Sequence, residues 1–129
     1  VCGPFTLASH LRGNDIFMDM FDDEDYVKDL LGFCADCAKR MSDLYLDAGM
    51  DVIAVVDPLV SQISSDHFEE FLSAPYTELS AICVKKSRRS LPFLCAAMPP
   101  AISRCVPHRA GFYFCGRKCG YPCSQGHLR

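Results

Sequence analysis

The stretch Asp51-Val-Ile-Ala-Val-Val-Asp57-Pro58 is a short, unbroken apolar run that ends in an acid and a proline. A run this short and this rich in β-branched residues is typical of a parallel strand buried on both faces. Helical patterns lie on both sides of it, which favours an α/β fold with a parallel sheet or barrel. In that architecture functional groups gather at the carboxyl ends of the strands, so Asp57 is a candidate catalytic residue. The alternative is that Asp57 only caps the turn before Pro58.

A long amphipathic helix is predicted before this strand. The acids of residues 22–25 stand where the dipole of a helix N-terminus favours negative charge. Apolar residues then recur every three or four positions, which predicts one helix over residues 24–48, ended by Gly49. Cys34 and Cys37 form a C-x-x-C pair on its apolar face. Because a redox pair belongs at the start of a helix that follows a strand, we interpret both as core residues.

Shorter elements are predicted on either side of the long helix and the strand, which should cover residues 52–56. Cys2-Gly-Pro-Phe reads as the end of a strand and a turn, followed by a helix that begins near Thr6. After the strand, a loop over residues 59–64 leads to a helix capped by Ser65 or Asp66.

Length and hydropathy limit the class of protein. With 129 residues, half of them hydrophobic, the chain has room for one domain or part of a larger one. No apolar run approaches the length of a membrane span, and Val1 does not begin a signal-peptide pattern. We therefore expect a cytoplasmic protein with no membrane partner. Since Val1 is not an initiator methionine, we also expect the chain to be cut from something longer.

Charge and cysteine content change together near Cys83. All 16 acidic residues lie at or before Glu78, so residues 1–83, with four basic residues, carry a net charge of −12. Residues 84–129 contain nine basic residues and no acid, a net charge of +9, and six of the nine cysteines lie from Cys83 onward. The sequence therefore predicts a domain segment over residues 1–83 and a separate tail over residues 84–129.

Four motifs in the first part resemble one family in their order and spacing. They are Gly3-Pro-Phe-Thr-Leu-Ala, the helix end Asp47-Ala-Gly-Met-Asp51, the strand ending in Asp57-Pro58, and Ile63-Ser-Ser-Asp-His-Phe-Glu-Glu-Phe71 followed by Pro75-Tyr76. Together they resemble the uroporphyrinogen decarboxylase superfamily, which also contains the corrinoid-dependent methyltransferases. The resemblance implies a TIM (β/α)8 barrel. Because such a barrel needs about 250 residues, we expect a fragment of it here, followed by an irregular tail.

Two positions favour the methyltransferase branch of this superfamily. In the decarboxylases, the helix that begins with Gly-Pro-aromatic-Thr-Leu carries a tyrosine that meets the porphyrinogen, and His10 stands at the matching position here. The decarboxylases also place a serine just after the strand, where this chain has Pro58. The resemblance implies that His10 and Asp57 are catalytic, and we expect both at the same end of the barrel. The substrate contacts that it implies are Gly3, Pro4, Phe5 and Pro58.

The methyltransferase branch implies a particular chemistry. A zinc-activated thiolate accepts a methyl group from a methylated corrinoid, and zinc lowers the pKa of the thiol so that the nucleophile exists at neutral pH. The intact parent would then need zinc, a corrinoid and a corrinoid protein as partner. The alternative is a uroporphyrinogen decarboxylase of tetrapyrrole (heme) biosynthesis, which needs no cofactor. We assign no metal ligand in this chain, and we expect it to bind no cofactor and to be inactive by itself.

The basic tail has two interpretations. One is a non-enzymatic zinc or nucleic-acid-binding tail on a small helical domain, and its candidate ligands are Cys105, His108, Cys115, Cys119, Cys123 and His127. Their C-x-x-x-C spacing is not the usual zinc pair, and no strand or helix pattern frames them.

The other interpretation is a shifted reading frame. Codons offset by one step over residues 94–103 permit V-C-G-D-A-T-R-N-I. A different offset over residues 111–129 permits D-S-I-S-V-D-E-N-V-D-I-P-A-A-K-A-I-C. Both strings resemble the continuation of the same family. We therefore predict an out-of-frame tail with little regular structure over residues 84–129, few contacts with the first part, and no nucleic-acid partner.

Overall fold

The computed structural model describes residues 1–51, 53–86, 93–95 and 113–114. Its sheet has the strand order β1-β2-β3, and both strand pairs are parallel. The strands are β1 (Ala54–Val56), β2 (Phe93–Cys95) and β3 (Tyr113–Phe114). The predicted strand at residues 52–56 is therefore confirmed as parallel, but it is shorter than expected.

The first three residues extend the sheet on the other side of β1. Cys2 forms a parallel bridge with Val56, the amide of Gly3 donates to the carbonyl of Val56 at 2.8 Å, and the amide of Val56 donates to the carbonyl of Val1 at 2.9 Å. Chain segments far apart in the sequence thus lie side by side with one common direction. The strand end predicted at Cys2 is therefore present only as a single parallel bridge.

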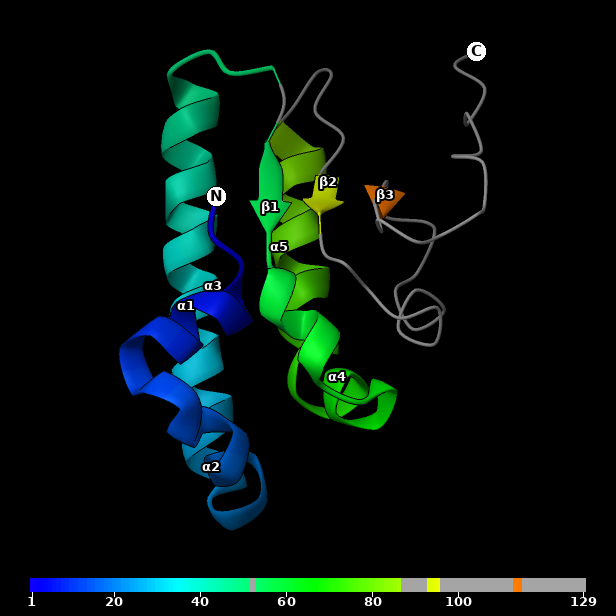
Figure 1. The fold of residues 1–129 in the computed structure, drawn as a ribbon. Helices are drawn as coiled ribbons and strands as arrows, with labels where there is room; N and C mark the ends of the chain where they lie inside the picture. The colour runs from blue at the N-terminus through cyan, green and yellow to red at the C-terminus, as the bar shows by residue number, and fades with distance from the viewer. Residues whose placement is uncertain (52, 87–92, 96–112, 115–129) are drawn as a thin grey trace.

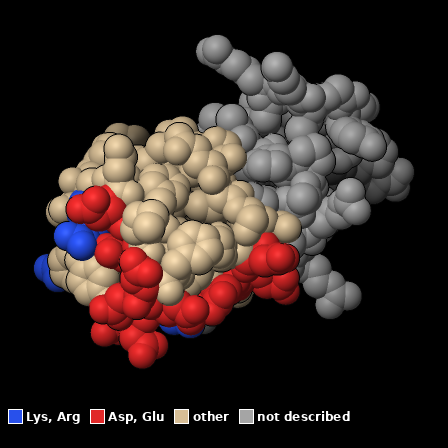
Figure 2. All heavy atoms as spheres, turned by 60° about the horizontal axis from the view of Figure 1, so that its bottom comes forward, with Lys and Arg blue, Asp and Glu red and all other residues tan. Residues whose placement is uncertain are grey.

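Seven helical segments surround the sheet in the part of the chain that is described. They are α1 (Pro4–Arg12), η1 (Gly13–Asp15), α2 (Ile16–Asp22), α3 (Glu24–Asp47), η2 (Pro58–Gln62), α4 (Ser65–Phe71) and α5 (Ser73–Lys86). Helices α3 and α5 run alongside the strands, whereas α1, α2 and α4 lie toward their carboxyl ends (Figure 1). The face of the molecule that carries this end shows a band of acidic side chains with few basic ones (Figure 2), in line with the charge of residues 1–83.

The predicted long helix is confirmed as α3, and both of its ends have local causes. Asp23 caps the N-terminus, because its side chain accepts a hydrogen bond from the amide of Tyr26. At the other end Gly49 has a φ of 90°, the left-handed conformation that glycine adopts without strain. The amides of Gly49 and Met50 donate back to carbonyls of the last turn, both at 3.0 Å, in a Schellman motif.

The core lies where the helices α1 to α5 pack against one another and against β1. Val27, Leu31 and Cys34 of α3 are fully buried there, so the core assignment of Cys34 is confirmed. Burial raises the pKa of the Cys34 thiol to about 11, which keeps it protonated. The core assignment of Cys37 is wrong, because its side chain is exposed. The apolar stripe predicted from the sequence is wider than the face of α3 that packs in the core, and Cys37 lies outside that face.

Three predicted details near the short helices are wrong. Helix α1 begins at Pro4 rather than near Thr6, because proline fits the first turn, where no amide donor is needed. Helix α4 is capped by Ser64, whose hydroxyl accepts from the amide of His67, rather than by Ser65 or Asp66. The loop expected at residues 59–64 contains η2 over most of its length.

The parallel strands and their flanking helices are consistent with a fragment of an α/β barrel, and the described residues form no closed barrel. In the tail, β2 and β3 are regular strands, so the expectation of irregular structure is wrong for those five residues. Helix α5 also continues past Cys83. The rest of the predicted tail, including its candidate zinc ligands, lies outside the described residues. No helix in the described part is long and apolar enough to cross a membrane.

Candidate functional site

Asp57 follows β1 directly, and its side chain continues the alternation of that strand. Val55 is fully buried, whereas Val56 is 44 % exposed on the opposite face of the sheet. Because successive side chains of a strand point to opposite faces, Asp57 lies on the side of Val55. It is fully buried there. The carboxylate therefore points into the helix layer and away from the open face of the sheet.

Four hydrogen bonds hold this carboxylate, and three of them come from the first turn of α1. Oδ2 accepts from the amide of Phe5 at 3.0 Å, and Oδ1 accepts from the amide of Thr6 at 2.8 Å and from its hydroxyl at 2.5 Å. The hydroxyl of Tyr76 on α5 donates to Oδ2. The first amides of a helix have no partner within the helix, and its dipole favours an anion at that point.

Asp57 thus caps α1 across more than 50 residues of sequence. The alternative that it only caps its own turn is wrong, because its side chain makes no capping hydrogen bond to η2.

Gly3 makes room for this carboxylate. A Cβ atom on Gly3 would lie 2.3 Å from both Cβ and Oδ2 of Asp57, which is far inside van der Waals contact. Gly3 has a φ of −71°, so its backbone does not require glycine, and the requirement comes from space alone. The Gly-Pro start of α1 and the Asp-Pro end of β1 therefore pack directly against each other, with Gly3 against the side chain of Asp57.

Burial and charge control the protonation of the groups in this cluster. Burial raises the pKa of Asp57, and the hydrogen bonds from Thr6, Tyr76 and Phe5 oppose that rise. The pKa of Tyr76 is raised well above its ordinary value, by burial first and then by the neighbouring carboxylate. The tyrosine therefore keeps its proton and acts as a donor to Asp57.

The predicted site residues differ in burial, since some are buried around Asp57 and others are exposed. Gly3 and Phe5 contact Asp57, and Pro4, beside them in the first turn of α1, is buried. His10 lies four residues after Thr6, which places it on the same side of α1 and one turn further along, with its side chain exposed. Pro58 is exposed at the start of η2. Catalytic or substrate-binding roles for all these residues stay predictions.

Sequence reasoning missed the parts played by Thr6 and Tyr76. Both stood inside motifs quoted for the family resemblance, but neither was given a role. For Tyr76 a signal existed, since it continues the buried stripe of Leu72 and Leu79, and a buried tyrosine usually needs a partner for its hydroxyl. The partner itself could not be read from the sequence.

The described residues do not fit a zinc ion. They contain no group of three or more His, Cys, Asp or Glu side chains arranged to hold a metal. No step that depends on zinc can therefore be assigned to them.

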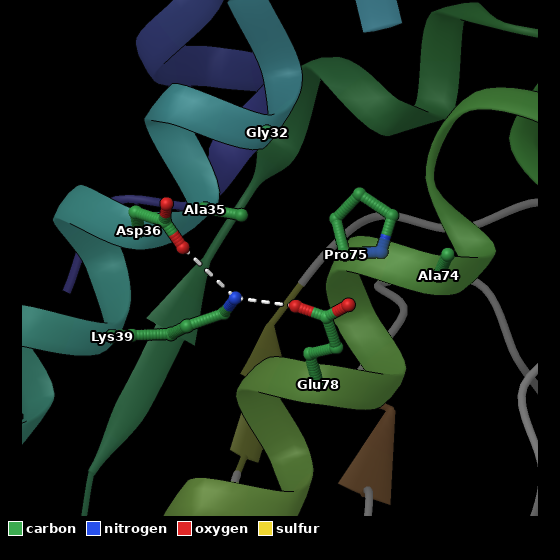
Figure 3. A pocket seen from close by; sticks show the side chains of 7 residues that line it. All are labelled: Gly32, Ala35, Asp36, Lys39, Ala74, Pro75 and Glu78. Carbon is green, nitrogen blue, oxygen red and sulfur yellow. Dashed lines mark hydrogen bonds and ion pairs between the residues drawn. The ribbon is translucent and has the colours of Figure 1, made fainter. Parts of the chain in front are cut away.

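A pocket of about 210 Å³ lies between α3 and α5, apart from the Asp57 cluster. Small residues line much of it. Lys39 on α3 reaches across it to Glu78 on α5 at 2.5 Å, and it also pairs with Asp36, one turn earlier on α3, at 3.0 Å (Figure 3). The hydrogen bond to Glu78 is the main cause that raises the pKa of Lys39. Two carboxylates already pair with this ammonium group, so the pocket offers no free charge to a ligand.

Parallel strands with flanking helices, and a strand-end carboxylate that caps one of those helices, define a segment of an α/β fold. A family model, uroporphyrinogen decarboxylase (URO-D), matches residues 1–111. The chain belongs to the uroporphyrinogen decarboxylase family, as the four motifs predicted. The match extends beyond Cys83, where we predicted the domain segment to end.

Two curated relatives place the chain near the corrinoid-dependent branch of this family. Both are named methylcobamide:CoM methyltransferase MtbA, and over 75 residues the chain is 39% identical to the one from Methanosarcina mazei and 36% identical to the one from Methanosarcina acetivorans. The match covers 57% of this chain and 22% of each relative, so the chain spans about a fifth of their length. No solved structure matches the chain.

Proposed function

We propose that the protein to which this segment corresponds transfers a methyl group from a methylated corrinoid to a thiol. The observation that carries the proposal is the identity of 39% and 36% to two proteins named methylcobamide:CoM methyltransferase. The family description names a decarboxylase, but these relatives favour the methyltransferase branch. A cytoplasmic location and a corrinoid protein as partner belong to the same proposal.

Within this segment we propose that His10 contacts the reactants. It is exposed on α1, the helix whose N-terminus meets the carboxyl end of β1. Asp57 supports catalysis from the buried side, because it fixes the first turn of α1. The substrate side is then shaped by Gly3, Pro4 and Phe5 at the start of α1 and by Pro58 at the start of η2. The zinc and corrinoid would be bound by parts of the parent outside the described residues.

A spectroscopic assay tests the proposal. The parent protein is incubated with methylcobalamin, with and without a thiol such as CoM, and loss of the methylcobalamin absorbance is followed. We expect demethylation only when both protein and thiol are present, with the methyl group recovered as a thioether. The 129-residue chain is the matched control, and we expect no turnover from it. Thiol-independent demethylation, or decarboxylation of uroporphyrinogen in its place, would refute the proposal.

We also propose that residues 84–129 are translated out of frame. The change in charge and cysteine content near Cys83 supports this, whereas the family match to residue 111 and the pairing of β2 with β1 count against it for the first part of the tail. The DNA sequence around the codons for residues 82–86 is the direct test, because a frameshift requires inserted or deleted bases there. Tight, stoichiometric zinc binding by the tail would contradict the frameshift and favour the zinc-binding alternative.

A further inference from the structure

The hydroxyl of Tyr76 joins two helices through one carboxylate. Tyr76 belongs to α5 and is 2 % exposed, and its hydroxyl donates to the same Oδ2 of Asp57 that accepts the amide of Phe5. The other oxygen of Asp57 accepts both hydrogen bonds from Thr6. The first turn of α1 is therefore linked to α5 only through Asp57 in this network.

The ring and the hydroxyl of Tyr76 have separate tasks. The ring stacks on Phe68, with centroids 5.7 Å apart and an interplanar angle of 29°, so packing alone fixes its place. A phenylalanine would fill the same space. It would also leave Oδ2 of the buried carboxylate with one donor fewer, and an ionised group that loses a hydrogen bond in the interior is strongly penalised. The hydroxyl therefore acts on Asp57 and not on the core.

The link controls the rotation of α1. Thr6 and His10 are four residues apart and lie on the same side of this helix. When the carboxylate fixes Thr6, it also fixes the direction in which His10 leaves the helix. We propose that Tyr76 is a positioning residue that, through Asp57, orients α1 and so places His10 for the reaction. The catalytic part of this inference rests on the proposed function.

Tyr76→Phe in the 129-residue chain tests the structural part. Tyr45→Phe is the matched control, because it removes the same hydroxyl from a side chain that is 42% exposed on α3. We expect amide exchange in the peptide of α1, followed by mass spectrometry, to accelerate roughly 10- to 100-fold in Tyr76→Phe and to stay unchanged in Tyr45→Phe. Labelling of His10 by diethylpyrocarbonate should change relative to that of His67 on α4. Equal exchange in α1 for both variants would overturn the inference.

Kinetics of the parent protein test the catalytic part. We expect Tyr76→Phe to lower kcat roughly 10- to 100-fold and to leave KM for the thiol unchanged, because a small displacement of a reacting group slows the step more than it weakens binding. If α1 exchanges faster but kcat per folded molecule is unchanged, Tyr76 is only structural and the inference fails. If the parent with Tyr76 intact transfers no methyl group, the proposed function fails, while exchange and labelling still decide whether Tyr76 orients α1.

Discussion

Replacing Gly3 by alanine places a methyl group where Asp57 already lies. The new Cβ would stand 2.3 Å from Cβ and Oδ2 of Asp57 and 2.4 Å from its Cγ, whereas carbon atoms in contact are normally about 3.5–4.0 Å apart. Neither the backbone of Gly3 nor the side chain of Asp57 can move away freely. The amide of Gly3 donates to the carbonyl of Val56, and the carboxylate is held by four hydrogen bonds.

The expected loss of stability combines two effects. Overpacking of a filled site costs about 1–3 kcal/mol, and each hydrogen bond to a charged group that the displaced carboxylate loses costs about 1.5–3 kcal/mol. If one such bond is lost, Gly3→Ala lowers the free energy of unfolding by about 2.5–6 kcal/mol. That is a large share of the roughly 5–15 kcal/mol that stabilises an ordinary domain.

Two other glycines provide controls with the same chemical change. Gly32 lies within α3, with no atom within 4 Å of an added Cβ, so Gly32→Ala should raise stability by about 0.5–1 kcal/mol. Gly49 also has open space but a φ of 90°, so Gly49→Ala should lower stability by about 1–2 kcal/mol. Urea titration followed by circular dichroism, together with amide exchange in the α1 peptide, measures all three. A Gly3→Ala variant as stable as the parent chain would refute the close approach to Asp57.

Three further perturbations follow from the described contacts. Burial raises the folded-state pKa of Asp57 above its ordinary 3.8, so the folded state holds this proton more tightly than the unfolded state. The stabilisation that Asp57 contributes therefore falls as pH rises from about 3.8 to the folded-state pKa. Asp57→Asn should remove this part of the pH dependence of stability, measured as the urea concentration at the midpoint of unfolding. Lys39→Met should lower stability by less than about 1 kcal/mol, with the difference vanishing in 1 M salt, because its partner Glu78 is largely exposed. Phe33 and Leu44 are about 60% exposed on α3. Changing both to serine should reduce aggregation and hydrophobic-dye binding of the purified chain while its helix content stays unchanged. If dye binding persists, the exposed apolar surface that binds the dye lies elsewhere.

The sequence by itself determined the elements whose causes are local. The long helix, its acidic first turn and its glycine end were predicted correctly, because periodicity and capping involve residues within a few positions of one another. The parallel strand before Asp57 was predicted for the same reason, since a short β-branched run between helices has few other solutions. Family membership also came from the sequence, through the order of four motifs.

Only the tertiary structure decided what Asp57 does. Its position after a strand marked it as a candidate catalytic residue. The alternation of β1 turns its side chain into the helix layer, a one-residue effect that depends on where the strand begins to pair. Its partners Thr6 and Tyr76 lie 51 and 19 residues away. Hydrogen bonds over such separations exist only once the sheet and helices have packed, because no local pattern records which buried donor will meet which acceptor.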